Sequence, residues 1–472
     1  MTAPANAPAN TPADAPALRI AIIGGGFTGA VLAIHAMGAS ADPLDIVVIE
    51  PRAELGRGIA YGTADRNHRI NVPSDRMDIA KETSGAATAW FQAQGILPDA
   101  DSDDGTGRSY VPRAAYGTYI GDLLARAVAA AGDRVRLRHL RTIATGIRPE
   151  NGGWTVIAET GERIVADRVA LCFGHAVPAL PCRLGPGVAA CRRFVPDPWA
   201  PGALAALGPE ASILVVGTGL TMADVVSSLC AAGHAGPITA VSRRGLLPKA
   251  HGRFLTTLDV IGQRQPATAL ELLRLVRRQI AAADPDLGWH PVVDSLRAVL
   301  HDVWNGLPPA ERRRVVRRLL PFWEVHRFRI APQIEAALVR AQAEGRLLVR
   351  KSALAGLSLA EDGRLEADLR SGAGIERHRF DAVVLCTGPE RDVARNPLVA
   401  ALLAEGTIGL DAVGLGIAVD RRSRVLAPSG APRPGLYAFG PMTRGSFGEM
   451  TGAPDIALHI ETVVTVLLAD QT

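Results

Sequence analysis

Short apolar runs alternate with longer amphipathic stretches over most of the chain. The run "RIAII" is followed by a glycine-rich turn, by the helix-like stretch "AVLAIHA" and by a second apolar run, "DIVVI". Short uninterrupted apolar runs are typical of strands buried on both faces of a parallel sheet, and the stretches between them have the period of crossover helices. The pattern therefore predicts an α/β fold built on parallel sheets.

The strand–turn–helix unit occurs twice along the chain. Gly24, Gly26 and Gly29 form a G-x-G-x-x-G turn in the first unit, and Gly217 and Gly219 repeat its first two glycines in the second. Two later segments, "GGWTVIAETGERIVADRVALCFG" and "GRLEADLRSGAGIERHRFDAVVLCTG", share one plan and end at Gly174 and Gly388. The repeat predicts two Rossmann-like three-layer dinucleotide-binding domains.

Each unit carries the chemistry of a nucleotide site. The glycines let the backbone approach a pyrophosphate, and the start of the following helix favours its negative charge. In the first unit the second strand ends at Glu50. A carboxylate there accepts hydrogen bonds from free ribose hydroxyls, which indicates FAD or NAD.

The second unit differs at that point, because its second strand runs into "VSRRG". Arg243 is as far from Gly217 as Glu50 is from Gly24, so we expect the two residues to occupy the same structural place. An arginine there, with Ser242 and Arg244 beside it, pairs with a 2′-phosphate and indicates NADPH. A solvated strand end is the alternative explanation of the two arginines.

Composition narrows the class of protein. The chain has 472 residues, is 48% hydrophobic and carries a net charge of +4, so nothing indicates a nucleic acid or a membrane surface as a partner. Its five cysteines include no C-x-x-C pair, so we expect no disulfide framework, no metal site and no electron transfer through adjacent thiols. With no signal peptide and no bilayer-length apolar run, the cytoplasm is the expected location.

The positions of the two repeated units and of the segments between them predict how the chain divides into domains. The helix-like stretches between the strand at "PITAVS" and its expected partner at "LLVRKS" are too many for one crossover, and they predict a helical insertion that caps the site. The predicted division is a disordered tail (1–17), an FAD-binding domain in two parts (18–205 and 391–472), a nested NAD(P)H-binding domain in two parts (206–254 and 334–390) and the insertion (255–333).

Several motifs carry a family resemblance that covers nearly everything after residue 18. The stretches "GRGIAYGTADRNHRINVPSDRM", "FVPDPW", "VSRRGLLPKAHG", "WEVHRFRIAP" and "GPMTRGSFGEMTGAPDIALH" resemble a bacterial FAD/NAD(P)-binding group of the two-dinucleotide-binding-domain flavoproteins. The chain is more distantly similar to flavin-dependent N-hydroxylating and class B monooxygenases. The resemblance implies FAD and NADPH as cofactors.

The resemblance also implies site residues. Asn71 faces the flavin, or else satisfies its own turn, and Arg113 contacts the pyrophosphate or packs. Pro441 stands where disulfide reductases carry an acid on the ribityl chain, so Thr443 is the expected replacement. Arg327, in "WEVHRFRI", binds an anionic substrate or belongs to a structural ion-pair cluster. Further cofactor contacts are expected from Phe27, Thr28, Tyr61, Thr221 and Gly440.

The chemistry implied is hydride transfer from NADPH to FAD. Oxygenation of an amine, sulfur or carbonyl group by the reduced flavin is the first hypothesis, with Asn71 and Arg327 as candidate catalytic residues. A reductase that passes electrons to another acceptor, and a non-catalytic flavoprotein that senses redox state, are the alternatives. The expected partner is a small-molecule substrate, and self-association stays open.

Overall fold

A parallel sheet forms the centre of the first domain. The computed structural model describes residues 16–174, 178–252, 258–262, 265–390 and 392–469. The sheet has the order β17-β18-β7-β1-β2-β3, and its pairs are parallel except β17–β18. Its strands are β1 (Leu18–Ile23), β2 (Leu44–Ile49), β3 (Val135–Leu140), β7 (Arg168–Leu171), β17 (Arg424–Leu426) and β18 (Pro432–Ala438). The antiparallel sheet β4 (Ala144–Glu150), β5 (Gly153–Ala158) and β6 (Arg163–Ala166) lies beside it.

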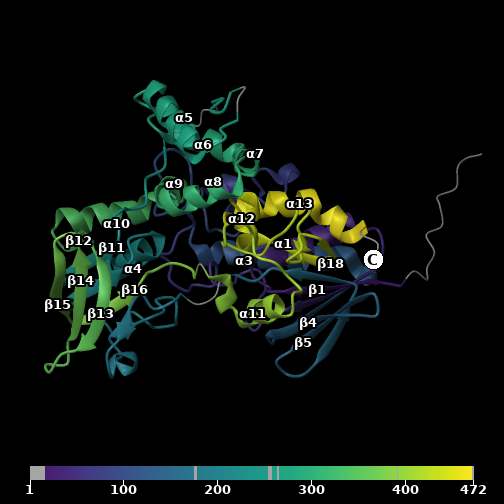
Figure 1. Ribbon diagram of the computed structural model, residues 1–472, viewed down its shortest axis with the longest axis horizontal. Coiled ribbons are helices and arrows are strands. Elements are labelled where there is room, and N and C mark those ends of the chain that lie inside the picture. The colour runs from purple at the N-terminus through teal and green to yellow at the C-terminus, as the bar shows by residue number, and fades with distance from the viewer. Residues whose placement is uncertain (1–15, 175–177, 253–257, 263–264, 391, 470–472) are drawn as a thin grey trace, which may run out of the picture.

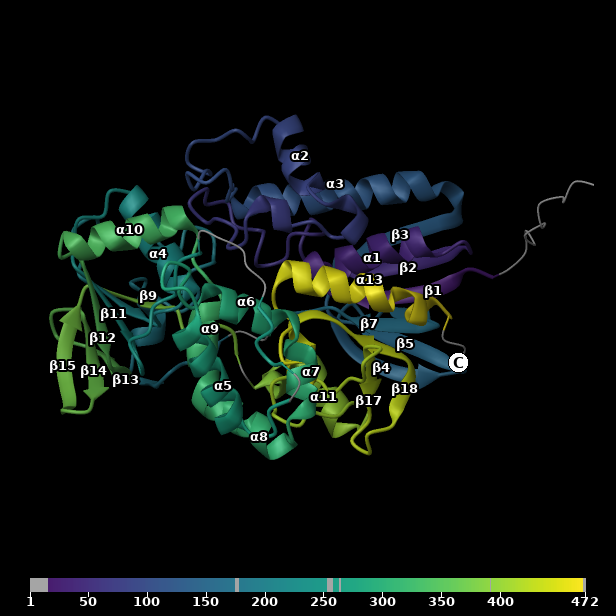
Figure 2. The ribbon, with the colours of Figure 1, turned by 90° about the horizontal axis from the view of Figure 1, so that it is seen from above.

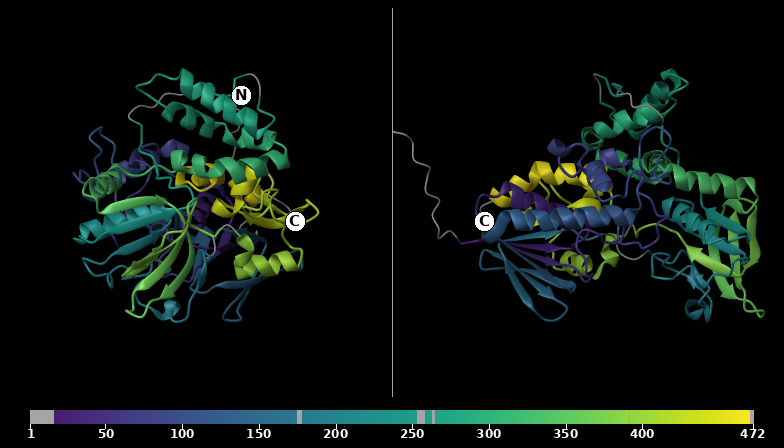
Figure 3. Two further views of the ribbon diagram at one scale, coloured as in Figure 1. Left: turned by 60° about the vertical axis from the view of Figure 1, so that its left-hand side comes forward. Right: turned by 180° about the vertical axis from the view of Figure 1, so that it is seen from behind.

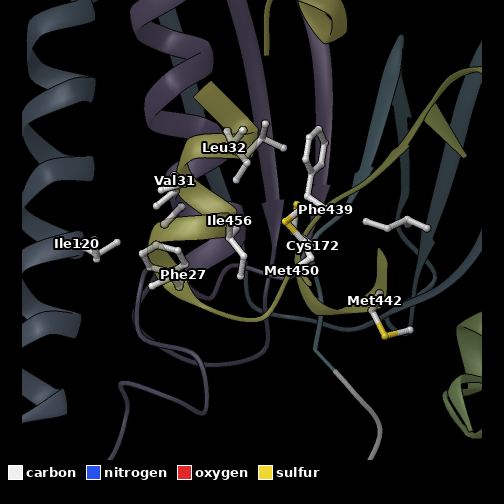
Figure 4. Packing of buried hydrophobic residues seen from close by; sticks show 14 of the residues in the cluster. Phe27, Val31, Leu32, Ile120, Cys172, Phe439, Met442, Met450 and Ile456 are labelled. Carbon is white, nitrogen blue, oxygen red and sulfur yellow. The ribbon is translucent and has the colours of Figure 1, made fainter. Parts of the chain in front are cut away.

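Helices on the first sheet form the largest core. Helix α1 (Phe27–Ala39) packs against α3 (Arg113–Ala131) and α13 (Ala453–Ala469). Figure 4 shows Val31 and Leu32 of α1 directed toward Ile456 of α13, with Cys172 close by. Val31 and Leu32 have no exposed surface, and replacing such a leucine by alanine typically costs about 2–5 kcal/mol. The start of α1 is therefore held firmly on the sheet.

The second domain repeats the first. Its parallel sheet has the order β12-β11-β10-β16-β9, with strands β9 (Phe194–Val195), β10 (Ile213–Val216), β11 (Ile238–Ser242), β12 (Leu347–Lys351) and β16 (Ala382–Leu385). A second, four-stranded sheet contains β8 (Arg183–Leu184), β13 (Ala353–Leu359), β14 (Leu365–Ser371) and β15 (Gly374–Phe380), and its pairs are antiparallel except β8–β13. Helix α4 (Leu220–Ala231) corresponds to α1, and α10 (Pro332–Ala343) packs against α4 and β12. The predicted α/β class and the internal repeat are confirmed.

The chain enters the second domain before the predicted boundary. Strands β8 and β9 lie within 18–205, the range assigned to the first domain, but β8 pairs with β13 and β9 pairs with β16. Two-residue strands carry too little periodic signal to be assigned from sequence. The pairing places residues 183–195 with the sheets of the second domain.

The predicted insertion separates two neighbouring strands. Strands β11 and β12 pair in parallel from Ile238↔Leu347 onward, and between them the chain forms α5 (Ala269–Ala282), α6 (His290–Ala298), α7 (Leu300–Gly306), α8 (Pro309–Arg314), the π-helical turn η5 (Val315–Leu319) and α9 (Leu320–Arg327). These helices rise above both domains in Figure 1, and from above they lie at the junction of the two (Figure 2). They have their own small core around Val292, Leu296 and Val303.

From two further sides the helices of the insertion again rise above the rest of the chain (Figure 3). Shorter elements complete the fold. The remaining α-helices are α2 (Ala86–Ala93), α11 (Pro397–Ala404) and α12 (Arg444–Phe447), and the 3-10 turns are η1 (Ser74–Arg76), η2 (Lys81–Thr83), η3 (Gly132–Arg134), η4 (Val188–Ala190), η6 (Val393–Arg395) and η7 (Gly440–Thr443). The predicted N-terminal tail falls almost entirely outside the described residues. Among the described residues no helix has the length and apolar character needed to cross a membrane.

Candidate functional site

The first glycine turn is packed so that only glycine fits. Gly24 has a φ of +98°, and a Cβ there would lie 2.8 Å from the backbone of Phe173. A Cβ on Gly29 would lie 2.0 Å from the carbonyl oxygen of Gly24. Helix α1 begins at Phe27 with no side-chain cap and no acid in its first turn, so its free N–H groups and its dipole favour an anion.

Glu50 closes this turn from the next strand. It is 4% exposed, and its Oε2 accepts a hydrogen bond from the Gly25 N–H at 3.0 Å. Its Oε1 accepts from the Arg52 backbone N–H at 3.1 Å and pairs with the Arg52 guanidinium at 3.0 Å. The carboxylate therefore lies at the glycine turn, where a ribose-binding acid is expected.

The C-terminal segment reaches the same place. Gly440 has a φ of +77°, and a Cβ there would lie 2.8 Å from Oγ1 of Thr28. Pro441 follows within η7. Thr443 has no exposed surface, and its hydroxyl donates to the Gly440 carbonyl oxygen at 2.8 Å. This geometry argues against the expected ribityl contact from Thr443, because the side chain is already satisfied inside the protein.

The second glycine turn is built in the same way. Gly217 has a φ of +120°, and a Cβ there would lie 1.9 Å from the Cys386 carbonyl oxygen, while Gly219 has open space around it. Helix α4 also begins without a side-chain cap or an acid in its first turn. Exposed Gly174 and half-buried Gly388 follow the central strands β7 and β16. Both sheets thus offer open backbone at their carboxyl ends, where nucleotides bind in such folds.

The register of the second sheet corrects one expectation. The Gly24 N–H donates to the Ile49 carbonyl oxygen at 2.9 Å, and the Gly217 N–H donates to the Val241 carbonyl oxygen at 2.8 Å. Ile49 and Val241 are therefore equivalent positions. Ser242, not Arg243, therefore takes the place of Glu50. The expectation was wrong by one residue because the second unit reaches its second strand one residue sooner, which counting along the chain cannot reveal.

Both arginines nevertheless remain beside the second turn. The Ser242 Oγ lies 2.7 Å from Thr218 Oγ1 and accepts from the Gly245 N–H at 3.0 Å. Arg243 is exposed. The Arg244 guanidinium lies 5.8 Å from the centre of the Phe322 ring. The Ser242 hydroxyl thus replaces the Glu50 carboxylate of the first unit. Arg243 follows it and makes no hydrogen bond or ion pair among the described residues.

One cavity lies where the two domains and the insertion meet. Its volume is about 270 Å³. Its wall includes Tyr61 and Asn71 of the first domain, Leu220 and Thr221 at the start of α4, Ala453 at the start of α13, and Arg327, Phe328 and Arg329 of the insertion. The starts of two helices thus face the same space as side chains from all three parts of the chain.

Asn71 and Tyr61 form the first-domain wall. The Asn71 Oδ1 is buried and has no hydrogen-bond partner, while its carbonyl oxygen accepts from His251 Nε2 at 2.9 Å. A buried acceptor of this kind is rare without a ligand or water, and it rules out the alternative in which the amide oxygen satisfies its own turn. Tyr61 packs on Phe27 and Tyr116 with ring centres 5.9 Å and 4.8 Å away, and burial raises its pKa to about 12.

Arg327 is compensated by two carboxylates. It is 8% exposed, and it lies 2.7 Å from Asp455 and 3.5 Å from Glu449. Asp455 also binds Arg297 at 2.7 Å. The structural ion-pair alternative therefore describes Arg327, although its side chain still lines the cavity.

Arg113 lines the cavity and is paired with an acid of the other domain. Its guanidinium binds the carboxylate of Asp224 on α4 at 2.8 Å and 3.1 Å. Asp224 is only 2% exposed and lies in the same cavity wall. Sequence analysis missed Asp224 because its partner comes from another domain, although an aspartate within the apolar stretch "MADVV" was a usable signal.

Comparisons with known proteins agree on the fold. Residues 21–176 match the family model described as FAD-NAD(P)-binding. No curated protein matches the sequence. Among the described residues, no group of His, Cys, Asp and Glu side chains is arranged so that it could hold a metal ion.

Solved structures resemble the chain over almost its full length. The ornithine N-hydroxylase of Kutzneria sp. 744 is 16% identical with a TM-score of 0.64, covering 96% of this chain and 99% of that chain. The ornithine hydroxylase of Pseudomonas aeruginosa is 18% identical with a TM-score of 0.62, covering 96% and 100%. The cadaverine monooxygenase of Erwinia amylovora is 15% identical with a TM-score of 0.61, covering 96% and 94%. The chain therefore has the fold of the two-dinucleotide-binding flavoproteins, as the resemblance predicted.

Proposed function

We propose that this chain is an FAD-dependent oxidoreductase that NADPH reduces, and that it is a monooxygenase acting on an amine, sulfur or carbonyl group of a small molecule. One observation carries the proposal: a single cavity is lined by the start of α4, the start of α13 and Asn71. That arrangement lets two nucleotide cofactors bound to different domains meet at one place.

The first domain fits FAD. Gly24, Gly26 and Gly29 leave room for a pyrophosphate at the start of α1, and Glu50 lies at the turn for the ribose. The buried Oδ1 of Asn71 offers an acceptor to a donor group of the bound flavin. Phe27, Thr28, Tyr61, Gly174, Gly440 and Pro441 complete the proposed site, and Thr443 supports it only through Gly440.

The second domain fits NADPH. Gly217, Gly219, Thr221 and Gly388 surround the second turn, and Ser242, Arg243 and Arg244 follow β11. The place of the ribose acid holds a hydroxyl, so no carboxylate at this position repels a 2′-phosphate. We assign 206–254 and 334–390 to this domain, together with β8 and β9.

The protein's part in the chemistry is positioning and exclusion of water. When bound, FAD supplies hydride acceptance and oxygen chemistry. Phe27, Tyr61 and Tyr116 form an aromatic wall, and the insertion covers the cavity with Phe328, Arg327 and Arg329. Arg327 acts in this proposal as part of that cover.

Oxygenation is favoured over thiol-dependent reduction. The full-length structural neighbours named above are hydroxylases or monooxygenases of amines. All five cysteines are free, and none of them lines the cavity. Free thiols also fit a reducing compartment, so we place the protein in the cytoplasm.

The test is anaerobic reduction followed by oxygen. The purified protein should bind FAD, and NADPH should bleach the flavin under anaerobic conditions. The reduced protein is then mixed with oxygen and a panel of amines, sulfides and ketones, and oxygenated product and hydrogen peroxide are measured. Product formation with one class supports the proposal. Peroxide alone with every class would refute the oxygenase assignment, and no reduction by NADPH would refute the oxidoreductase.

A further inference from the structure

Two buried side chains join the nucleotide-binding domains beside the cavity. Arg113 is the first residue of α3 in the first domain, and Asp224 lies one turn into α4 in the second. They are 9% and 2% exposed. Their atoms meet in a fork, at 2.8 Å from Nη1 to Oδ2 and 3.1 Å from Nη2 to Oδ1. A two-point contact fixes direction as well as distance.

The fork is rigid on the first-domain side. The Arg113 Nε donates to the Arg69 carbonyl oxygen at 2.8 Å. The backbone N–H of Arg113 donates to the carbonyl oxygen of His68 at 2.8 Å. The hydrogen bond from Nε therefore orients the planar guanidinium, whose other two nitrogens meet Asp224.

A second contact holds α4 one turn further along. Ser228 follows Asp224 by four residues, so the two share one face of the helix. The Ser228 hydroxyl donates to Asp65 Oδ2 at 2.5 Å and accepts from His68 Nε2 at 3.0 Å. Burial lowers the pKa of His68, which favours the neutral ring that donates this hydrogen bond. Two fixed points on one face prevent α4 from turning or sliding against the first domain.

We propose that Arg113 and Asp224 are positioning residues for hydride transfer. They hold the start of α4, and with it the NADPH that the proposed function places there, in register with the flavin side of the cavity. The inference rests on the proposed function. Both residues line the cavity, and the inference assigns to their ion pair the orientation of one domain against the other.

A purely structural role is the competing explanation. A buried ion pair can be replaced by apolar residues of similar size without loss of stability, whereas removing one partner leaves an uncompensated charge. The double variant Arg113→Met/Asp224→Leu separates the two roles, because it restores packing without restoring the fork. The control is Arg350→Met/Glu376→Leu, a more exposed ion pair of 2.6 Å that lies within the second domain, and neither of its residues lines the cavity.

The experiment measures four quantities in each protein: FAD content, melting temperature, NADPH affinity and the limiting rate of anaerobic flavin reduction. We expect the double variant to keep the first three and to reduce its flavin more slowly, by about tenfold to a hundredfold, as displacements of about 1 Å do. The absorbance band that NADP⁺ produces when it stacks on reduced flavin should weaken in parallel. The control should match the wild type throughout.

A wild-type rate and band in the double variant would overturn the inference, and so would equal losses in the control. Should the double variant lose FAD, Arg113→Lys decides instead, since lysine keeps the charge without the fork. A slower rate at unchanged NADPH affinity then supports the inference, and an unchanged rate overturns it. Failure of the proposed function looks different, because the wild type itself would not be reduced by NADPH.

Discussion

The charge that follows β11 should decide which nicotinamide nucleotide this protein uses. The Arg243 side chain is exposed, and among the described residues it makes no hydrogen bond or ion pair. Because Arg243 has no such partner in the described part of the chain, it breaks no existing hydrogen bond or ion pair when it binds a phosphate. Replacing it in Arg243→Ala should therefore weaken NADPH binding without weakening the fold.

The magnitude follows from the type of contact. A hydrogen bond to a charged group contributes about 1.5–3 kcal/mol, and about 1.4 kcal/mol corresponds to a tenfold change in affinity. Solvent exposure and salt reduce such contacts, so the loss should lie nearer tenfold than a hundredfold. NADH has no 2′-phosphate, and its affinity should not change.

The assay is the rate of anaerobic flavin reduction against the concentration of each nucleotide. Arg340→Ala is the control, because Arg340 is an exposed arginine of the same domain at the far end of α10. Equal weakening of NADPH and NADH in Arg243→Ala, or a wild-type preference for NADH, would refute the assignment.

The register of β11 gives the reverse test. Because Ser242 takes the place of Glu50, the acid that discriminates against a 2′-phosphate belongs at 242. Ser242→Glu should shift preference toward NADH more than Arg243→Glu does. If Arg243→Glu shifts the preference more than Ser242→Glu in the same assay, equivalent positions in the two sheets do not contact equivalent parts of their nucleotides.

Three further changes test the site and its support. Gly26→Val should abolish FAD binding, since even a Cβ there lies 3.3 Å from Gly58 Cα; full FAD absorbance in the variant would contradict this. Arg327→Ala should lower stability by about 3 kcal/mol, because it removes the cationic partner of Glu449, whose side chain is only 10% exposed and which keeps hydrogen bonds from Thr451, and an unchanged denaturation midpoint would be inconsistent with that. His251 is buried, which lowers its pKa to about 4; the unfolded chain therefore binds the extra proton first, and stability should fall as pH drops from about 6.5 toward 4. His251→Gln should flatten that part of the pH–stability curve, and an unaltered slope would exclude His251 as its source.

Local pattern was sufficient to predict the fold because each repeated unit is specified within a few dozen residues. The glycine turns, the apolar strands and the insertion between β11 and β12 all leave signals of that range. The equivalence of Ser242 and Glu50 was not predictable, since one residue of difference in a connection is visible only in strand pairing. Asp224 and the burial of Thr443 were missed for a related reason, because both depend on partners brought together by tertiary packing.

The insertion is connected along the chain to the second domain but packs on the first. Its chain leaves and re-enters the second domain between β11 and β12, yet Arg297 and Arg327 bind Asp455 of α13, and the Trp304 indole donates to Gly445 at 2.8 Å. The insertion is therefore anchored on the C-terminal part of the first domain, while α4 belongs to the second. The insertion also contacts the segment that follows β11, since the Lys249 N–H donates to the Val325 carbonyl oxygen at 3.0 Å and the Arg244 guanidinium lies 5.8 Å from the centre of the Phe322 ring. Under the proposed function, the contacts of α4 with the first domain would set the rate of flavin reduction, and the insertion, which contacts both domains, would set which substrate reaches the flavin.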